Sequence, residues 1–251
     1  MNLNVFEKLV GTIITSLAFA FEVLLFKVYF KQQDLSPLIF LSAFLLCFSG
    51  YSYLRFTLDN CINGISIASF ILFLISIYIY GSLINRVILT SKIILLGIAL
   101  LIILIYHSSL YKNILRGNII LKPLAISIVW LLLIFLYVNE FEWKFYFHQG
   151  LFIALLTIFF DIKTINTDPF STLPKVLGIT KTKRILAIFI ILYALLSVFF
   201  SMSLSIVFII ISVLLLMSIL LDFMFKDLWL YVFYDGVIIL QSIIVSFTFS
   251  Q

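Results

Sequence analysis

The chain has 251 residues, 64% of them hydrophobic and 11% charged, and a formal net charge of +5. Soluble domains have about 45–50% apolar and about 25% charged residues, so a chain this apolar could not cover its surface with polar groups in water. The composition excludes a soluble globular protein and predicts an integral membrane protein. Its positive charge then points to orientation in the bilayer and to lipid headgroups, not to nucleic acid.

Nine apolar segments follow one another along the chain, separated by clusters of charged residues. A transmembrane helix needs about 20 residues, and in these segments the apolar residues lie all round the helix instead of along one stripe. The segments predict an all-α fold, a polytopic membrane bundle of about nine transmembrane helices in a single transmembrane domain over residues 1–251. The predicted spans are 11–30, 36–54, 64–84, 89–107, 119–138, 145–160, 184–200, 203–221 and 229–248.

Basic residues are divided unequally between the two faces that nine spans define. The face with the N-terminus and the loops after even-numbered spans holds 11 of the 16 Lys and Arg residues. Because cytoplasmic loops carry an excess of Lys and Arg, this bias predicts that the N-terminus and these loops are cytoplasmic, in an inner or plasma membrane. Two longer polar loops, 107–122 and 161–184, fall on this face, and loops of this kind are where function is expected.

The most informative segment is 160–184, with the sequence FDIKTINTDPFSTLPKVLGITKTKR. Asp161 ends the sixth span and Asp168 follows seven residues later, so both carboxylates lie on one face if the helix continues for two turns. Paired carboxylates at a membrane surface suit Mg²⁺, which takes oxygen ligands and shares its coordination shell with substrate phosphates. A solvated loop with no ligand is the alternative interpretation of the same charges.

This segment resembles the second aspartate-rich motif of the UbiA superfamily of intramembrane prenyltransferases. Members typically show D-I-x-D-x-x-x-D, then T-L-P and an L-G pair. Thr164 replaces the middle aspartate here, and the spacer before Thr172 is shortened. The loop 106–122, YHSSLYKNILRGNIILK, is similar to the family's tyrosine-plus-basic loop between spans 4 and 5, and nine spans with cytoplasmic even-numbered loops is the family's architecture. The matching residues are Asp161, Ile162, Asp168, Thr172, Leu173, Pro174, Leu177 and Gly178.

The family's first motif, N-D-x-x-D-x-x-x-D, is expected at the end of the second span. Its best placement is 51–59, YSYLRFTLD, in which Asp59 takes the last acidic position. Tyr51, Ser52 and Arg55 stand where Asn, Asp and Asp are usual. A guanidinium at this position would repel a metal ion, but it could pair with a carboxylate or bind a diphosphate through its planar fork.

The resemblance implies that the chain transfers a prenyl group from a prenyl diphosphate to a lipophilic acceptor, with Mg²⁺ ions bridging carboxylates to the diphosphate. Asp161 and Asp168 are then the expected catalytic residues, and the expected metal ligands are Asp59, Asp161 and Asp168. The replaced acids of the first motif leave open whether the site is active. Basic residues expected to bind the diphosphate are Arg55, Lys112, Arg116, Lys122 and Lys181.

Two other functions fit the same residues. The loss of acids in both motifs favours a non-catalytic protein of the same fold, which binds an isoprenoid or another lipid or scaffolds a membrane complex. A small transporter is the third interpretation, but transporters commonly show internal repeats and helices broken near the midplane. No half-to-half repeat is found here, and the prolines (Pro37, Pro123, Pro169 and Pro174) lie at span ends or in loops.

Three further polar residues stand out by position. Glu22 lies within the first span and Asp235 within the ninth, each among apolar neighbours. Acids at membrane depth are costly and often functional, so each is expected to face the bundle interior, line a cavity or pair with a base. His148 lies at a helix end without a second His or Cys at ligand spacing, which predicts an interfacial polar role and not metal binding.

Overall fold

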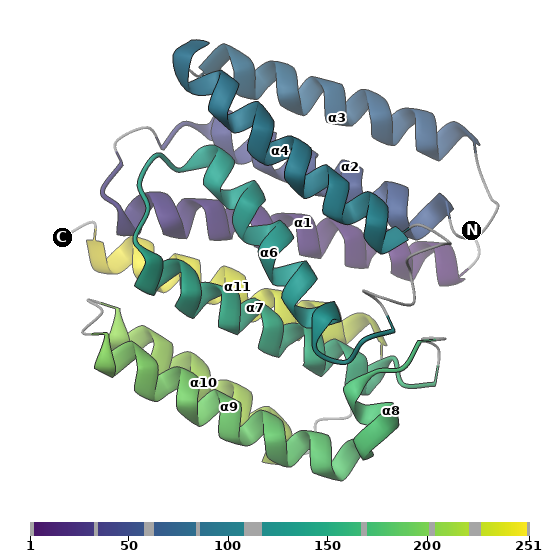
Figure 1. The fold of residues 1–251 in the computed structure, drawn as a ribbon, viewed down its shortest axis with the longest axis vertical. Coiled ribbons are helices and arrows are strands. Elements are labelled where there is room, and N and C mark those ends of the chain that lie inside the picture. The colour runs from purple at the N-terminus through teal and green to yellow at the C-terminus, as the bar shows by residue number, and fades with distance from the viewer. Residues whose placement is uncertain are drawn as a thin grey trace. The chain divides into compact units, whose positions relative to one another are not determined.

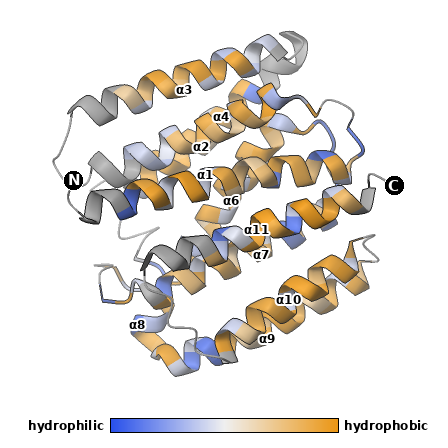
Figure 2. Ribbon diagram, turned by 180° about the vertical axis from the view of Figure 1, so that it is seen from behind, coloured by the Kyte–Doolittle hydropathy of each residue, from blue (hydrophilic) through white to orange (hydrophobic). Residues whose placement is uncertain are grey.

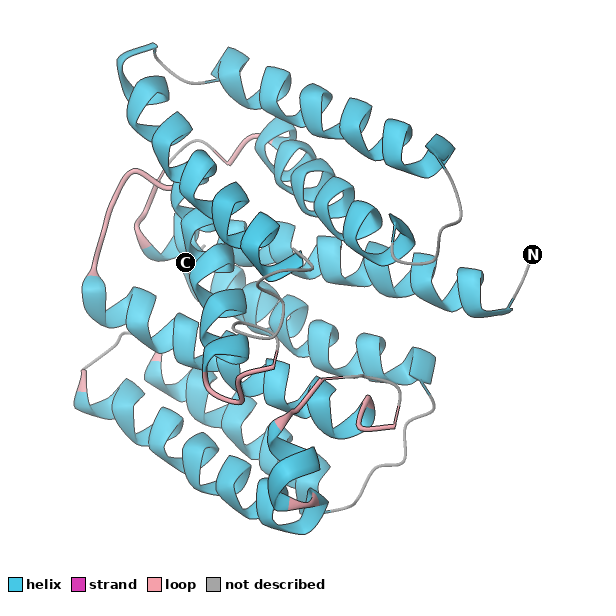
Figure 3. Ribbon diagram, turned by 45° about the vertical axis from the view of Figure 1, so that its right-hand side comes forward, coloured by secondary structure: helices cyan, strands magenta, loops and turns pink. Residues whose placement is uncertain are grey.

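The computed structural model describes residues 3–32, 35–57, 63–83, 86–107, 117–166, 170–200, 204–220 and 227–249. These residues form ten α-helices and the loops between them, with no strand in the described ranges (Figure 3). The predicted all-α fold is confirmed for this part of the chain. The helices are α1(Leu3–Tyr29), α2(Pro37–Thr57), α3(Asn63–Leu83), α4(Arg86–His107), α6(Leu121–Tyr137), α7(Trp143–Lys163), α8(Leu173–Leu177), α9(Ile179–Phe199), α10(Ser205–Leu220) and α11(Asp227–Phe249).

Each of the nine predicted spans overlaps one of these helices, and the tenth, α8, lies in the polar segment 161–184. Three helical stretches within the described ranges are long and apolar enough to cross a membrane: Glu7–Tyr29, Trp143–Ile162 and Ile179–Phe199. Six further apolar helices are shorter, with 10–17 residues in the part searched. Figure 2 shows the helices as hydrophobic over most of their length, with a hydrophilic start to α9 beside α8.

The chain divides into two compact units, and Figure 1 labels the helices of both. Unit 1 comprises Met1–Ile94, Leu136–Asn139 and Phe225–Gln251, and unit 2 comprises Leu95–Phe135 and Glu140–Met224. In unit 1, α1 packs against α2 and α11, and α2 packs against α3. In unit 2, α9 packs against α7 and α10, while the short α8 contacts both α7 and α9.

Helices α2 and α3 are joined by a reciprocal pair of serine hydrogen bonds. Ser42 Oγ donates to the carbonyl of Ser76 at 3.2 Å, and Ser76 Oγ donates to the carbonyl of Ser42 at 2.9 Å. Both side chains are fully buried, and Ser42 Oγ also lies 3.0 Å from the hydroxyl of Tyr137. Small hydroxyl residues let helix backbones approach closely in a membrane protein, where hydrogen bonds and packing replace the hydrophobic drive between helices.

Ser76→Leu is expected to lower the free energy of unfolding by about 2–3 kcal/mol, because leucine overpacks the α2–α3 contact and removes its hydrogen bonds. Tyr78→Leu, two residues along α3 at a side chain 79% exposed, is the matched control. The control should change stability by less than about 0.5 kcal/mol. Unfolding by denaturant in detergent micelles measures both, and equal effects of the two variants would contradict the close-packing argument.

Many large apolar side chains remain exposed on α3 and α9. They include Phe70, Leu74 and Tyr78 on α3, and Leu195 and Phe199 on α9. Soluble monomers rarely expose contiguous apolar surface of this kind, whereas lipid solvates it. These faces agree with the membrane environment predicted from composition.

The end of α1 shows how local backbone geometry stops a membrane-length helix. Lys31 adopts φ 52, in the left-handed region. Its backbone N–H donates to the carbonyl of Val28, and the N–H of Gln32 donates to the carbonyl of Lys27. This is the Schellman pattern, which satisfies carbonyls that a helix end would otherwise leave unpaired.

Candidate functional site

Helices α6 and α7 of unit 2 run antiparallel, and three side-chain contacts fix their register. Lys122 meets Asp161 near one end, Phe135 meets Tyr146 near the other, and the Leu131 side chain lies over Gly150 between them. A Cβ atom at Gly150 would come within 2.9 Å of Leu131 Cδ1, so glycine permits this close approach. The start of α6 and the end of α7 therefore share one end of the unit.

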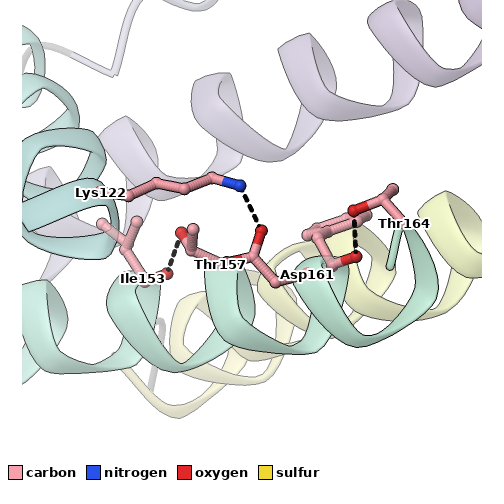
Figure 4. Close-up of polar contacts among 6 residues, drawn as sticks. Lys122, Ile153, Thr157, Asp161 and Thr164 are labelled. Atoms are coloured by element: carbon pink, nitrogen blue, oxygen red, sulfur yellow. Dashed lines mark hydrogen bonds and ion pairs between the residues drawn. The ribbon is translucent and has the colours of Figure 1, made fainter. Parts of the chain in front are cut away.

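A buried ion pair joins these two helix ends (Figure 4). Lys122 Nζ donates to Asp161 Oδ1 at 2.5 Å, and the two side chains are only 7% and 6% exposed. Leaving either charge buried alone would cost several kcal/mol, so each residue fixes the other in place. The sequence predicted Lys122 as a diphosphate ligand and Asp161 as a metal ligand, and the structure brings them into direct contact.

The positions of both charges oppose the dipoles of their own helices. Lys122 is in the first turn of α6, where the helix dipole favours negative charge, and Asp161 is in the last turn of α7, where it favours positive charge. Each placement costs its helix up to about 1 kcal/mol. Helix stability therefore does not account for either residue, and the pairing of the two charges offsets this cost.

The local structure of α6 positions Lys122. Asn118 Oδ1 accepts hydrogen bonds from the backbone N–H groups of Ile120 and Leu121, both at 3.0 Å, and so caps the helix start. Pro123 lies in the first turn of α6, where proline is tolerated. The capped turn holds the lysine stem along α7.

Two threonines lie near the end of α7, and a third lies directly before α8. Thr157 lies one turn before Asp161 on the face turned to Lys122 (Figure 4), and its hydroxyl donates to the carbonyl of Ile153 at 2.9 Å. The hydroxyl of Thr164 donates to the carbonyl of Phe160 at 2.9 Å. Thr172 differs from both, because its hydroxyl is fully buried with no hydrogen-bond partner among the residues that the structure describes.

The Thr-Leu-Pro and Leu-Gly residues of the sequence motif form a defined element. Thr172 precedes α8, Pro174 occupies its first turn and is buried, and α8 ends at Leu177. Gly178 then adopts φ 82, a conformation that a side chain strains, and the next residue begins α9. This turn places Lys181 on the first turn of α9, where it is exposed.

The structure locates some of the predicted site residues and not others. Lys122, Asp161 and Lys181 all belong to unit 2. Arg55 lies in α2, but its side chain is outside the described part of the chain. Four other predicted residues are also outside the described ranges: Asp59, Lys112, Arg116 and Asp168.

No group of three or more His, Cys, Asp or Glu side chains that could hold a metal ion is found among the described residues. Asp161 alone among them is a candidate Mg²⁺ ligand from the sequence motif. Mg²⁺ in phosphate-processing sites is often held by one or two carboxylates together with substrate oxygens, so a single described carboxylate is compatible with this kind of site. No family model, curated protein or solved structure matches the chain.

The surroundings of His148 were not visible in the sequence. The side chain is fully buried, and its ring stacks on Tyr193 at 4.0 Å and lies 4.4 Å from the ring of Phe208. Its Nε2 lies 3.2 Å from the backbone carbonyl of Tyr193. This histidine is part of an aromatic cluster that joins α7, α9 and α10.

Proposed function

We propose that the chain is a UbiA-like integral membrane protein with nine spans and a cytoplasmic N-terminus. It binds a prenyl diphosphate at the cytoplasmic ends of α6 and α7 and transfers the prenyl group to a lipophilic acceptor. The observation that supports this proposal is the buried Lys122–Asp161 pair, in which a predicted diphosphate ligand contacts a predicted metal ligand.

The ion pair offers the two charges that a magnesium–diphosphate complex requires. Phosphate oxygens accept charge-assisted hydrogen bonds from an ammonium group, and a carboxylate is a ligand of Mg²⁺. Lys122 and Asp161 neutralise each other before the ligand binds. On binding, each would exchange its protein partner for a ligand charge, so no buried charge is left unpaired at either stage.

Asp161 would hold Mg²⁺ together with Asp168 and Asp59, the further carboxylates expected from the sequence. When bound, the metal would stabilise the negative charge that develops on the leaving diphosphate. Lys122 and Lys181 would orient the diphosphate oxygens. The donor's C–O bond breaks with its electron pair on the diphosphate, and the acceptor bonds to the prenyl carbon and loses a proton.

Purified protein is expected to bind labelled prenyl diphosphates in a Mg²⁺-dependent manner and to release diphosphate when an acceptor is present. Asp161→Asn and Lys122→Gln should each weaken binding at least about tenfold, a loss of about 1.4 kcal/mol. Lys175→Gln, at an exposed side chain of α8, is the matched control and should bind as the wild type does. Absence of binding and of diphosphate release for every donor length would contradict the proposal.

A non-catalytic lipid-binding protein of the same fold is the second candidate. One observation favours it: Lys122 already neutralises Asp161. This candidate predicts that lipid co-purifies and that Mg²⁺ leaves thermal stability unchanged. Turnover gained only after Arg55→Asp and Thr164→Asp together would support it, whereas loss of a wild-type activity in Asp161→Asn would exclude it.

A further inference from the structure

A second set of buried polar side chains lies in unit 1, between α1 and α11. Thr15 of α1 and Asp235 of α11 are 5% and 3% exposed, and Thr15 Oγ1 lies 2.7 Å from Asp235 Oδ2. The same Oγ1 lies 2.8 Å from the carbonyl oxygen of Gly11. A hydroxyl has one hydrogen to donate, and a carbonyl has none. The Thr15 hydroxyl therefore shares its one hydrogen between the Gly11 carbonyl and Asp235 Oδ2.

Glu22 lies further along the same face of α1. It is seven residues after Thr15, about two helical turns, so both side chains point to the α11 side. Glu22 is fully buried, and neither carboxyl oxygen has a hydrogen-bond partner among the described residues.

The chain direction identifies the part of α11 that lies level with Glu22. Helix α1 starts at the end of unit 1 where the N-terminus lies, and α11 finishes at the opposite end, so the two run parallel (Figures 1 and 2). From the Thr15–Asp235 contact, two further turns lead to Glu22 on α1 and to Gln241 and Ser242 on α11. Both of these residues are fully buried. We call the five residues the α1–α11 seam: Thr15, Glu22, Asp235, Gln241 and Ser242.

Described side chains around the seam supply no positive charge to Glu22. Lys27 is five residues along α1, about 140° round the helix, and it donates to Gln32 Oε1 at 3.3 Å. The described side chains of α2, 37–53, include no charged residue, and those of α11, 233–247, include only Asp235. An ionised carboxylate buried without a counter-charge is strongly disfavoured, so Glu22 requires a proton or another cation.

We propose that the α1–α11 seam is a monovalent-cation site within the membrane, separate from the Lys122–Asp161 pair. Glu22 binds an exchangeable proton or a small alkali cation there, two helical turns from the hydrogen bond that Thr15 donates to Asp235. The inference does not depend on prenyl transfer, because the two sites belong to different units and share no residue.

Infrared spectroscopy of purified protein tests the site through the C=O stretch of a protonated carboxyl group. Glu22→Gln should remove one such band from the wild-type spectrum, and Glu7→Gln, at the start of the same helix, should leave it in place. In the wild type this band should disappear at high pH or on addition of Na⁺ or Li⁺. Loss with pH alone identifies a proton site, and loss on adding the alkali ion at constant pH identifies an alkali-cation site.

Labelling with a hydrophobic carbodiimide tests the same site in the wild-type chain, so the result does not depend on the folding of a variant. The reagent adds to protonated carboxyl groups in apolar surroundings, and mass spectrometry locates the adduct. We expect an adduct on Glu22 whose yield falls as the infrared band falls. A Glu22 band that is absent at every pH, or present and unchanged at every pH and ion concentration, would overturn the proposal.

Discussion

Replacing Lys122 by methionine is expected to lower the free energy of unfolding by about 3–5 kcal/mol. Methionine keeps the apolar stem of the side chain but removes the ammonium group that lies 2.5 Å from Asp161 Oδ1. The carboxylate would then be buried at the end of α7 without its partner. Denaturant unfolding in detergent micelles, followed by circular dichroism, measures the loss.

The double variant Lys122→Met/Asp161→Leu separates the cost of an unpaired charge from the net contribution of the pair. Replacing both partners of a buried ion pair by apolar residues is often neutral or stabilising. We therefore expect the double variant to regain most of the stability lost in Lys122→Met. Lys175→Met, at an exposed position, should stay within about 0.5 kcal/mol of the wild type. A double variant as unstable as the single one would show that the ion pair does not explain the loss.

The helices could be predicted because each contains a long apolar segment. The residues at which the helices begin and end could not be predicted in this way. The spans begin at residues 11 and 184 in the prediction, whereas α1 begins at Leu3 and α9 at Ile179. Hydropathy reports the part of a helix suited to hydrocarbon, whereas backbone hydrogen bonding continues through charged residues such as Lys8 and Lys181. The left-handed Gly178, not a change in polarity, marks the start of α9.

The sequence singles out the residues of the candidate site, but it does not show that Lys122 and Asp161 contact each other. Its charge and its place in the motif indicated Asp161 as a metal ligand. Its place in the basic loop indicated Lys122 as a diphosphate ligand. Their pairing does have a signal in the sequence: Lys122 lies at the start of the fifth span, Asp161 ends the sixth, and consecutive spans run antiparallel. The buried state of Thr172 has no such signal, because it depends on how α8 packs against α7 and α9.

The environment of His148 shows the same limit of sequence patterns. A histidine six residues into a helix that starts at Trp143 is typical of an interfacial position by depth alone. Its true surroundings come from α9 and α10, which supply Tyr193 and Phe208. A contact between helices distant in sequence leaves no periodicity in either of them.

Phe208→Ala should lower the free energy of unfolding by about 3 kcal/mol, because Phe208 holds the aromatic cluster of unit 2 together. Its ring is fully buried and contacts His148, Tyr193 and Phe145. Core Phe→Ala changes cost about 3–5 kcal/mol in water-soluble proteins. The lower end applies here because lipid also solvates an unpacked helix, so the loss arises mainly from the cavity and the missing ring contacts.

Ile206→Ala is the matched control for this prediction, since it shortens a side chain 73% exposed on the same helix, α10. Lipid fills the space that this change leaves, so stability should shift by less than about 0.5 kcal/mol. Phe208→Leu should fall between the wild type and Phe208→Ala, because leucine fills part of the cavity. The same unfolding measurement ranks the three variants. Equal losses for Ile206→Ala and Phe208→Ala would mean that apolar area, and not packing between α7, α9 and α10, determines the stability of unit 2.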